Sequence, residues 1–349
     1  MNDESAMQRA IEQAATARTR TSPNPWVGAV VVADGGVVGV GATQPPGGHH
    51  AEVMALAVAG DAAQGATLVV TLEPCSHQGR TGPCVDAIIR AGVARVVIAI
   101  LDPDHRVAGR GVAALRDAGV DVGVGVLAGA VSEQLLPYLV HRRTGRPYVV
   151  CKMATSIDGG TAAPDGSSRW ITGLHARHDV HQLRAESDAI VVGAGTVRVD
   201  DPALTVRHVD GRDPLRVVLG SAPAHAKVHP CLERTGDLAR LLDELGDRGV
   251  LQVLVEGGQS VVRAFHDQDL IDRYVIYLAP ALFGGIDKVP LLAGPTAPTI
   301  GEVWRGEFVD VRRIGTDIRL DLIPTTRSTT MADTTLQHGS RPEHDRAGR

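Results

Sequence analysis

The stretch that decides the fold reads HAEVMALAVAG over residues 50–60 and ATLVVTLEPCSHQGRTGPC over residues 66–84. The first part is continuously apolar after its acidic start and predicts a helix that runs to about Ala59. The second part predicts a strand from Ala66 to Thr71, then a loop that carries cysteine, then a helix over Val85–Ala91. Strands that alternate with helices of this length are typical of a layered α/β sheet.

Four side chains in this stretch indicate a catalytic metal site. One imidazole and two thiolates, from His50, Cys75 and Cys84, supply three ligands and leave the fourth tetrahedral position of a zinc ion open. Glu52 is then the free carboxylate, because the pattern His-x-Glu followed by Pro-Cys and a second Cys belongs to zinc deaminases, in which the glutamate moves protons. A single such residue is more often an ordinary core or surface residue, and His49 keeps that interpretation. The order of all four favours the metal.

The spacing of the two cysteines departs from the common deaminase signature. Cys84 follows Cys75 by nine positions, whereas the signature places the second cysteine three positions later. The inserted loop over 76–83 carries donors suited to a phosphate. We expect Cys84 in the first turn of the following helix, where the N-terminal dipole favours a thiolate.

Composition limits the class of protein. A chain of 349 residues with 44% hydrophobic and 21% charged residues predicts about two globular domains. The net charge is −5, and the arginines are dispersed among acids, so no basic stripe indicates a nucleic-acid partner. Four cysteines without a disulfide framework, no apolar signal core and no apolar run of ~18 residues predict a cytoplasmic protein that does not enter a membrane.

The first half is expected to hold one domain, over residues 1–144. Met7–Arg18 predicts a helix, and Val27–Val32 with Val37–Gly41 predict a hairpin joined at Asp34-Gly35-Gly36. The polar, basic stretch His141–Pro147 then indicates a domain boundary.

A second α/β domain is expected over residues 148–324. Its predicted strands and helices alternate; they are strands 148–154, 189–192, 215–219, 250–255 and 274–278, and helices 174–187, 237–245 and 260–265. Glu256-Gly257-Gly258 ends an apolar strand and starts a helix, an arrangement that suits a cofactor phosphate, although Gly-Gly after a strand is more often a plain turn. The tail 325–349 has few apolar residues and is predicted to be disordered.

Longer motifs carry a resemblance over nearly the whole chain. In the first half these are Asn24-Pro25-Trp26-Val27-Gly28, His50-Ala51-Glu52, Glu73-Pro74-Cys75-Ser76-His77, Gly79-Arg80-Thr81 and Val107-Ala108-Gly109-Arg110-Gly111. In the second half they are Met153–Gly159, Ser168–Thr172, Asp200–Arg207 and Glu256-Gly257-Gly258. With these motifs the chain resembles the bifunctional deaminase/reductase of riboflavin biosynthesis.

The resemblance implies a cytidine-deaminase-like fold for the first domain. That domain would remove an amino group from a diamino-hydroxy-pyrimidine that carries a phosphoribosylamino group. By the same resemblance Asn24 and Asp102 would contact the substrate, and His77 with Arg80 would face its phosphate. Position 104 departs from the family, which has Asn-Pro where this chain has Asp104-His105. A carboxylate there would repel a phosphorylated substrate unless it points away.

For the second domain the resemblance implies a dihydrofolate-reductase-like fold that uses NADPH to reduce the ribosyl unit to ribityl. The residues expected to touch NADPH are Ala154, Trp170, Thr196, Asp200, Ser221 and Gly258. Those expected to hold the substrate are Ser168, Arg184, Leu204, Arg207 and Glu256. Lys152 and Asp200 are candidates for proton or charge management. The interval from Ser221 to Glu256 is shorter than the family pattern.

Several alternatives stay open at this point. A monofunctional deaminase with a vestigial reductase half is the main one. A nucleobase or tRNA deaminase whose second half only binds, and a zinc-stabilised binding module without turnover, are the others. The resemblance is compatible with a homo-oligomer and names a phosphorylated pyrimidine as the small-molecule partner.

Overall fold

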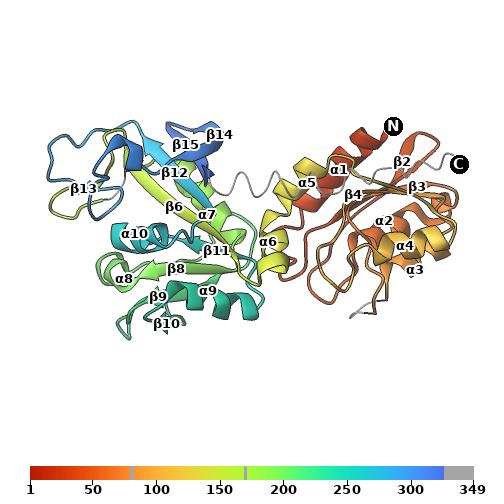
Figure 1. The fold of residues 1–349 in the computed structure, drawn as a ribbon, viewed down its shortest axis with the longest axis horizontal. Helices are drawn as coiled ribbons and strands as arrows, with labels where there is room; N and C mark the ends of the chain where they lie inside the picture. Colours follow the sequence, from red (N-terminus) through yellow and green to blue (C-terminus); the bar gives the residue numbers. More distant parts are fainter. Residues whose placement is uncertain (79–81, 169–170, 326–349) are drawn as a thin grey trace, which may run out of the picture. The chain divides into compact units, whose positions relative to one another are not determined.

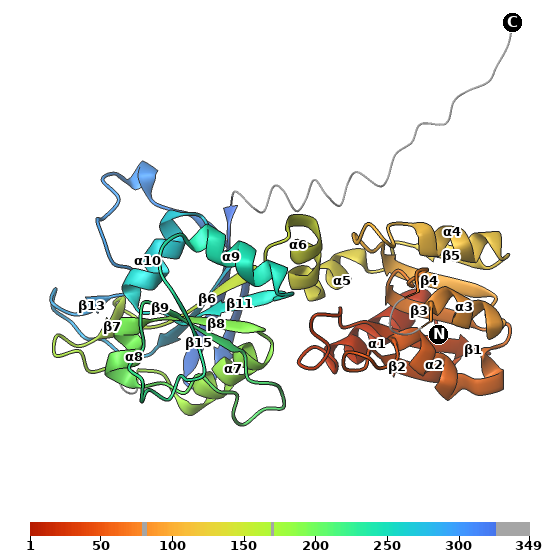
Figure 2. The ribbon, with the colours of Figure 1, turned by 90° about the horizontal axis from the view of Figure 1, so that it is seen from below.

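The structure is a computed structural model that describes residues 1–78, 82–168 and 171–325 (Figures 1 and 2). It divides into two compact units, one of Met1–Val149 with Arg177–Val261 and one of Val150–Ala176 with the chain from Val262 onward. This division runs through the second half of the chain, so the domain limits 1–144 and 148–324 stay a prediction. The predicted disordered tail lies, from residue 326, outside the described residues.

The N-terminal sheet has five strands in the order β2-β1-β3-β4-β5. They are β1 (Gly28–Ala33), β2 (Gly36–Ala42), β3 (Thr67–Leu72), β4 (Arg95–Ile100) and β5 (Asp121–Val124). β1 pairs antiparallel with β2 and β3, and β3, β4 and β5 are parallel. Asp34 and Gly35 at the hairpin turn both have positive φ, as a tight two-residue turn requires. The predicted hairpin and alternating strands are confirmed.

Helices cover both faces of this sheet, with α1 and α5 on one face and α2, α3 and α4 on the other (Figure 1). They are α1 (Asp3–Ala15), α2 (Ala51–Ala59), α3 (Cys84–Arg90), α4 (Arg110–Asp117), α5 (Ala128–Gln134) and, after the sheet, α6 (Leu136–Thr144). Val30, Val69 and Ile98 between the layers are fully or almost fully buried. A Cβ on Gly41 of β2 would lie 2.3 Å from the Ala51 carbonyl oxygen, so glycine lets α2 approach the sheet closely.

The basic stretch His141–Pro147 is not an extended linker. Its first residues complete α6, in whose last turn basic side chains complement the helix dipole. His141 is buried, and its Nε2 lies 3.0 Å from the Gly246 carbonyl oxygen. The stretch is therefore anchored to residues of the same unit that are about a hundred positions away.

Four strands of the same unit, in the order β10-β9-β8-β11, are parallel. The elements of this part of the unit are β8 (Ala189–Gly193), α8 (Ala194–Asp200), β9 (Leu215–Leu219), β10 (Leu232–Arg234), α9 (Leu238–Asp247) and β11 (Gln252–Val255). The division between the units runs through α7 (Leu174–Ala185) and α10 (Gln259–Asp267). β8 is buried along its whole length, as the apolar run predicts. The side chain of Asp237 caps α9 by accepting the backbone N–H groups of Ala239 and Arg240.

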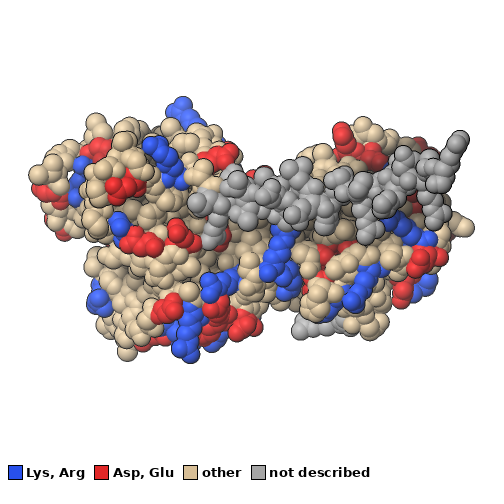
Figure 3. Space-filling view, in the orientation of Figure 1, with Lys and Arg blue, Asp and Glu red and all other residues tan. Residues whose placement is uncertain are grey.

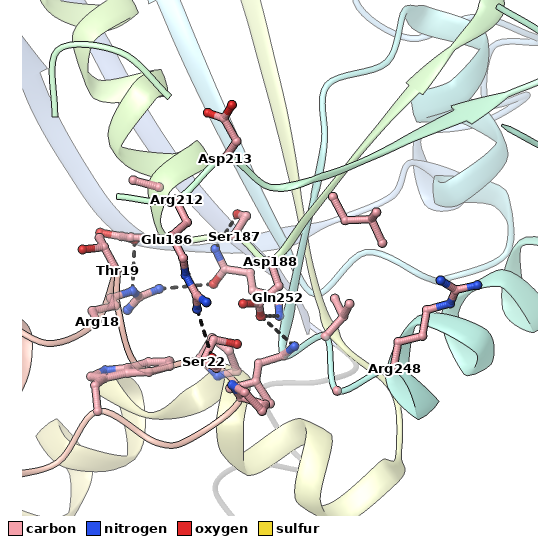
Figure 4. Close-up of a pocket in the computed structure, with 18 residues that line it drawn as sticks. Arg18, Thr19, Ser22, Glu186, Ser187, Asp188, Arg212, Asp213, Arg248 and Gln252 are labelled. Atoms are coloured by element: carbon pink, nitrogen blue, oxygen red, sulfur yellow. Dashed lines mark hydrogen bonds and ion pairs between the residues drawn. The ribbon is translucent and has the colours of Figure 1, made fainter. Parts of the chain in front are cut away.

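Polar contacts surround a cavity of about 380 Å³ in this unit (Figure 4). Arg18 lies 4.9 Å over the Trp26 ring, donates to Gln252 at 3.2 Å and pairs with Glu186 at 3.2 Å. Arg212 donates to the Ser22 carbonyl oxygen at 3.0 Å. None of the candidate metal ligands lines this cavity. The residues that line the cavity come mostly from the N-terminal segment and from the part of the chain around the parallel strands.

The second unit holds strands in the order β6-β12-β15-β14 and a small sheet of β13 and β7. They are β6 (Tyr148–Ser156), β7 (Gly160–Ala162), β12 (Arg273–Ala279), β13 (Val289–Pro290), β14 (Gly306–Ile314) and β15 (Asp317–Pro324). Two short 3-10 helices are also present, η1 (Gly60–Ala63) in the first unit and η2 (Ile300–Glu302) in the second. β15 carries buried charges: Asp321 is fully buried and accepts from Arg319 and Arg273 at 2.7 and 2.8 Å.

The charges on one face of the molecule can be compared with their dispersed distribution in the sequence. On the face that Figure 3 shows, acidic and basic side chains are interspersed. Among the described residues, none of the helices combines the length and the apolar character that a membrane crossing needs.

Candidate metal centre and active sites

Three elements bring the candidate zinc ligands together. His50 is the N-cap residue of α2, Cys84 is the first residue of α3 after Pro83, and Cys75 follows β3. Nδ1 of His50 lies 3.5 Å from Sγ of Cys75 and 3.2 Å from Sγ of Cys84. The backbone N–H of Cys84 also donates to Sγ of Cys75 at 3.4 Å. The expected start of a helix at Cys84 is confirmed.

Electrostatics favour a thiolate in this cluster. Hydrogen bonding from Cys84 lowers the pKa of the Cys75 thiol to about 4, with a further contribution from His50. The pKa of Cys84 is raised because it shares its proton with Cys75 and is buried. The pKa of His50 is raised by its hydrogen bond to Cys75. The cluster therefore supplies a thiolate sulfur at Cys75 that a cation can bind.

Glu52 lies in the first turn of α2 with only 3% of its surface exposed. Burial raises the pKa of its carboxyl to about 7, against the opposing effect of His50. Its side chain interacts with the Cys84 thiol, which places it beside the cluster. A carboxyl with a pKa near neutrality can both accept and return a proton at the pH of the cell.

The donor set fits zinc. One imidazole nitrogen and two sulfurs lie within 4.8 Å of one another, and two of them are separated by little more than 3 Å. Zn–N and Zn–S bonds of about 2.1 and 2.3 Å in a tetrahedron place the ligand atoms roughly 3.6 Å apart. Three protein donors with a buried acid next to them are the set of groups that an open, catalytic zinc site requires.

Glu73 has a structural role that the sequence analysis did not identify. Its buried carboxylate accepts four backbone N–H groups, from Asp102 at 3.2 Å, Gly109 at 2.9 Å, Gly111 at 2.9 Å and Val112 at 3.1 Å. Three of these donors stand at the start of α4. Glu73 therefore caps α4 from outside and fixes the loop after β4 next to the Pro74-Cys75 turn.

Asp102 lies in that fixed loop. It is buried, accepts the Tyr138 hydroxyl at 3.0 Å, and burial raises the pKa of its carboxyl to about 6. Asn24 is half-buried in the turn before β1, and its backbone N–H donates to Thr21. His77 is half-buried with Nδ1 sealed from solvent. Arg80 lies outside the described residues.

The carboxylate of Asp104 is buried and pairs with guanidinium groups, of which that of Arg106 is itself exposed. Its carboxylate accepts Nε and Nη2 of Arg106 at 2.9 and 2.6 Å, and Nε of Arg142 lies 3.7 Å away. These guanidinium groups, Arg106 first, hold the pKa of Asp104 well below its usual range. The negative charge is neutralised within the protein, so the departure from the family pattern at this position does not create an exposed carboxylate.

We expect Asp104→Asn to destabilise the protein by about 1–2 kcal/mol at neutral pH, because the amide loses charge-assisted hydrogen bonds to a partly exposed arginine. A carboxyl whose pKa is lowered by folding stabilises the native state above its unfolded pKa of about 3.8 and loses this contribution at lower pH. Urea unfolding at pH 7 and pH 3 measures this. An equal difference between wild type and variant at both pH values would contradict the ion pair.

In the second half, several candidate residues follow the ends of adjacent parallel strands. β8 and β11 pair in parallel, and each leads into a helix, α8 or α10. A Cβ placed on Gly258 would lie 3.4 Å from Oγ1 of Thr196, so the two turns face each other across a space that glycine leaves open. Thr196 is half-buried and Gly258 exposed. Such an edge is where α/β sheets bind ligands.

Arg184 and Glu256 form a bidentate ion pair. Nε and Nη2 of Arg184 donate to the two carboxylate oxygens at 2.7 and 2.8 Å, and Nη1 donates to the Thr205 carbonyl oxygen at 3.3 Å. Both side chains are about nine-tenths buried. The pair fixes the segment that contains the buried Leu204. The guanidinium fork of Arg184 is thus directed at protein groups.

His181 was missed by sequence reasoning. It is buried on α7, and its Nδ1 accepts the backbone N–H of Arg207 at 3.1 Å. Burial, together with Arg184 and Arg207, lowers its pKa to about 4, so the ring is neutral at pH 7. His181 lies one helical turn before Arg184, so helix periodicity could have indicated that the two side chains share a face of the helix. Arg207 itself is exposed.

The remaining candidates are two exposed residues of the first unit, three residues of the second unit and one residue outside the described chain. Asp200 at the end of α8 and Ser221 are exposed. Ala154 on β6, Lys152 and Ser168 are half-buried and belong to the second unit. Trp170 lies outside the described residues.

Comparison with known families matches both halves of the chain. Residues 1–100 match the cytidine and deoxycytidylate deaminase zinc-binding region, and residues 147–320 match the RibD C-terminal domain. The expected fold class is confirmed, with a cytidine-deaminase-like domain followed by a RibD-type α/β reductase domain.

Relatives and solved structures match over most of their length. The riboflavin biosynthesis protein RibD of Escherichia coli (strain K12) is 38% identical over 366 residues, which covers 93% of this chain and 100% of the relative. That of Mycobacterium tuberculosis (strain ATCC 25618 / H37Rv) is 45% identical over 331 residues, with 91% and 96% covered. The structure of Acinetobacter baumannii RibD, form 1, superposes with a TM-score of 0.88 at 38% identity and covers 93% of this chain and 99% of its own. The chain therefore belongs to the RibD family of bifunctional riboflavin biosynthesis enzymes, with a deaminase half and a reductase half.

Proposed function

We propose that the chain deaminates a diamino-hydroxy-pyrimidine that carries a phosphoribosylamino group, and then reduces the ribosyl unit of the product to ribityl with NADPH. The cluster of His50, Cys75 and Cys84 beside the buried Glu52 is the observation that carries the first step. The match of residues 147–320 to the RibD C-terminal domain supports the second, and favours two activities over a vestigial reductase half. The match runs through the shortened interval between Ser221 and Glu256.

In the deaminase half, His50, Cys75 and Cys84 would hold zinc through Nδ1 and two sulfurs. Zinc, when bound, supplies Lewis-acid activation of water at neutral pH. The carboxyl of Glu52 accepts the proton of the attacking water and returns it to the departing ammonia. Asp102 orients the pyrimidine, and Tyr138 holds the Asp102 carboxylate in place. Asn24, His77 and Arg80 complete the proposed substrate contacts.

In the reductase half, NADPH would lie against Thr196, Asp200, Ser221 and the turn at Gly258, with Ala154 and Trp170 as further contacts. NADPH supplies the hydride, and the protein holds the sugar carbon against it. The substrate residues in this proposal are Ser168, Arg184, Leu204, Arg207 and Glu256. Because Arg184 is paired with Glu256, we assign the substrate phosphate to the exposed guanidinium of Arg207, and assign to the pair the positioning of the segment at Leu204.

This assignment gives two arginine variants different outcomes. Arg207→Gln should raise the KM of the reductase step for the pyrimidine about tenfold or more with little change in stability, because an exposed phosphate contact is lost. Arg184→Gln should destabilise the fold by about 3 kcal/mol, because Glu256 stays buried without its partner. Steady-state kinetics and urea unfolding of both variants measure this. The reverse pattern would contradict the assignment.

The proposed function is tested by NADPH oxidation. The purified full chain is given the deaminated pyrimidine and NADPH, and absorbance of NADPH is followed. We expect turnover that depends on the pyrimidine. A chain that releases ammonia from the diamino-pyrimidine but never oxidises NADPH would leave a monofunctional deaminase.

The cysteines of the chain bear on the cellular compartment in which these reactions take place. All four cysteines are free in the structure. Thiolate ligands stay available in a reducing compartment, so we propose a cytoplasmic enzyme whose partners are the phosphorylated pyrimidine and NADPH.

A further inference from the structure

A second cluster of metal-ligating side chains lies away from the deaminase site. His229, Cys231 and Glu233 stand at alternate positions where the chain enters β10, and their ligand atoms all lie within 4.8 Å of one another. His229 and Cys231 precede β10 with a bend at Pro230 between them, so the ligand-atom separations, rather than strand alternation, bring His229 to the other two side chains. β10 is the edge strand of its sheet, and of the three side chains His229 and Glu233 are exposed while Cys231 is half-buried.

We propose that these three side chains form a second divalent metal site, which binds zinc. Nδ1 of His229 lies 3.4 Å from Sγ of Cys231. This is within the range of the nitrogen–sulfur separations in the deaminase cluster, 3.2 and 3.5 Å. A nitrogen, a sulfur and a carboxylate oxygen are each zinc donors, and three of them leave one tetrahedral position to water.

Backbone groups of the preceding loop orient the side chains of His229 and Glu233. Nε2 of His229 lies 3.0 Å from the Pro223 carbonyl oxygen, which can only accept. Nε2 therefore carries the ring proton, and the lone pair of Nδ1 faces Cys231. Oε1 of Glu233 accepts the backbone N–H of Ala222 at 2.9 Å, which leaves its other oxygen available.

Both supporting contacts come from neighbouring residues of one loop. Ala222 and Pro223 precede the cluster by only a few positions and hold two of its three ligands from behind. This arrangement of a carbonyl and an amide behind the ligands is typical of metal sites, where outer contacts fix ring tautomer and carboxylate direction. One thiolate and one carboxylate neutralise a divalent ion, so its binding leaves no uncompensated charge.

The site differs from the deaminase centre in what it can do. Two of its three ligands are exposed, and a buried acid like Glu52 is not among them. We therefore infer a structural role, in which the metal ties the loop at Ala222 and Pro223 to the edge strand β10. Metal there would protect the strand edge and the Cys231 thiol rather than activate water.

The test is metal stoichiometry of the full chain. Protein equilibrated with zinc under reducing conditions and then dialysed is analysed by elemental mass spectrometry. We expect about two zinc ions per chain for the wild type and about one for Cys231→Ser, with ammonia release unchanged. Cys84→Ser should also hold about one, and the double variant Cys84→Ser/Cys231→Ser close to none.

Matched controls separate the cluster from adventitious surface binding. His229→Ala should lose the second zinc, whereas His225→Ala should keep it, because His225 is an exposed histidine of the same loop outside the cluster. Cobalt added to Cys84→Ser should give a thiolate-to-metal absorption band that Cys231→Ser removes in this background. One zinc in the wild type, or a second zinc that survives Cys231→Ser, overturns the proposal.

Discussion

Glu52→Gln should abolish ammonia release while zinc stays bound. The amide has the size of the carboxyl but cannot take the proton of the attacking water, so kcat of deamination should fall by roughly 10²- to 10⁴-fold. Zinc content should not change, because Glu52 is not one of the three proposed ligands. Ammonia release and zinc content of the same preparation are the measurements.

Two controls keep this result separate from unfolding. NADPH oxidation with the deaminated pyrimidine should match the wild type, because that step uses the other half of the chain. Stability gives the second control. Burial raises the pKa of Glu52 from 4.5 to about 7, so ionisation of this carboxyl costs the metal-free native state stability as pH rises through that range. The metal-free Gln variant should therefore be at least as stable as the wild type at pH 8. Retained turnover would remove Glu52 from the proposed chemistry.

Glu73→Ala should cause the largest loss of stability among the substitutions considered. Four backbone N–H groups lose their common acceptor in a buried place, and each unsatisfied donor costs about 1–3 kcal/mol before relaxation. We expect at least about 3 kcal/mol in urea unfolding. Deamination should fall too, because the loop that carries Asp102 is released.

A graded series sharpens this expectation. Glu73→Gln keeps one oxygen acceptor but turns an amide donor toward the other N–H groups, so its stability should lie between those of wild type and Glu73→Ala. Glu12→Ala, an exposed glutamate on α1, is the matched control and should change stability by less than about 0.5 kcal/mol. A loss for Glu73→Ala as small as that of the control would show that water replaces the carboxylate without cost.

Local patterns predicted which candidate metal ligands come together, because their signals are short in sequence. His50 and Cys84 stand at helix starts that apolar runs and Pro83 indicate directly, and the structure places their ligand atoms together. The role of Glu73 could not be predicted in this way. Its partners lie 29–39 positions later and are backbone groups, which leave no mark in the side-chain pattern.

Buried charge explains why strand β15 was not predicted from the sequence. In β15 the buried side holds Asp317, Arg319 and Asp321, whereas Ile318 is 40% exposed. The usual alternation of apolar inside and polar outside is thus reversed, so a period-two pattern does not identify the inner face. Ion pairing of Asp321 with Arg319 and Arg273 makes this reversal possible.

The Arg184–Glu256 pair shows a similar limit. Family resemblance assigns both residues to the substrate but gives no information on whether they bind each other. Their separation of 72 positions hides a contact that the parallel strands create. The same folding places His181 beside Arg207, so the charge of this region depends on three elements that the sequence presents far apart.

Removal and return of zinc tests the central claim most directly. The full chain is stripped with a chelator under reducing conditions, and ammonia release and NADPH oxidation are measured before and after zinc is added back. We expect the stripped chain to release no ammonia from the diamino-pyrimidine, to keep oxidising NADPH with the deaminated product, and to regain ammonia release with zinc. A metal-free chain that still deaminates would contradict the account.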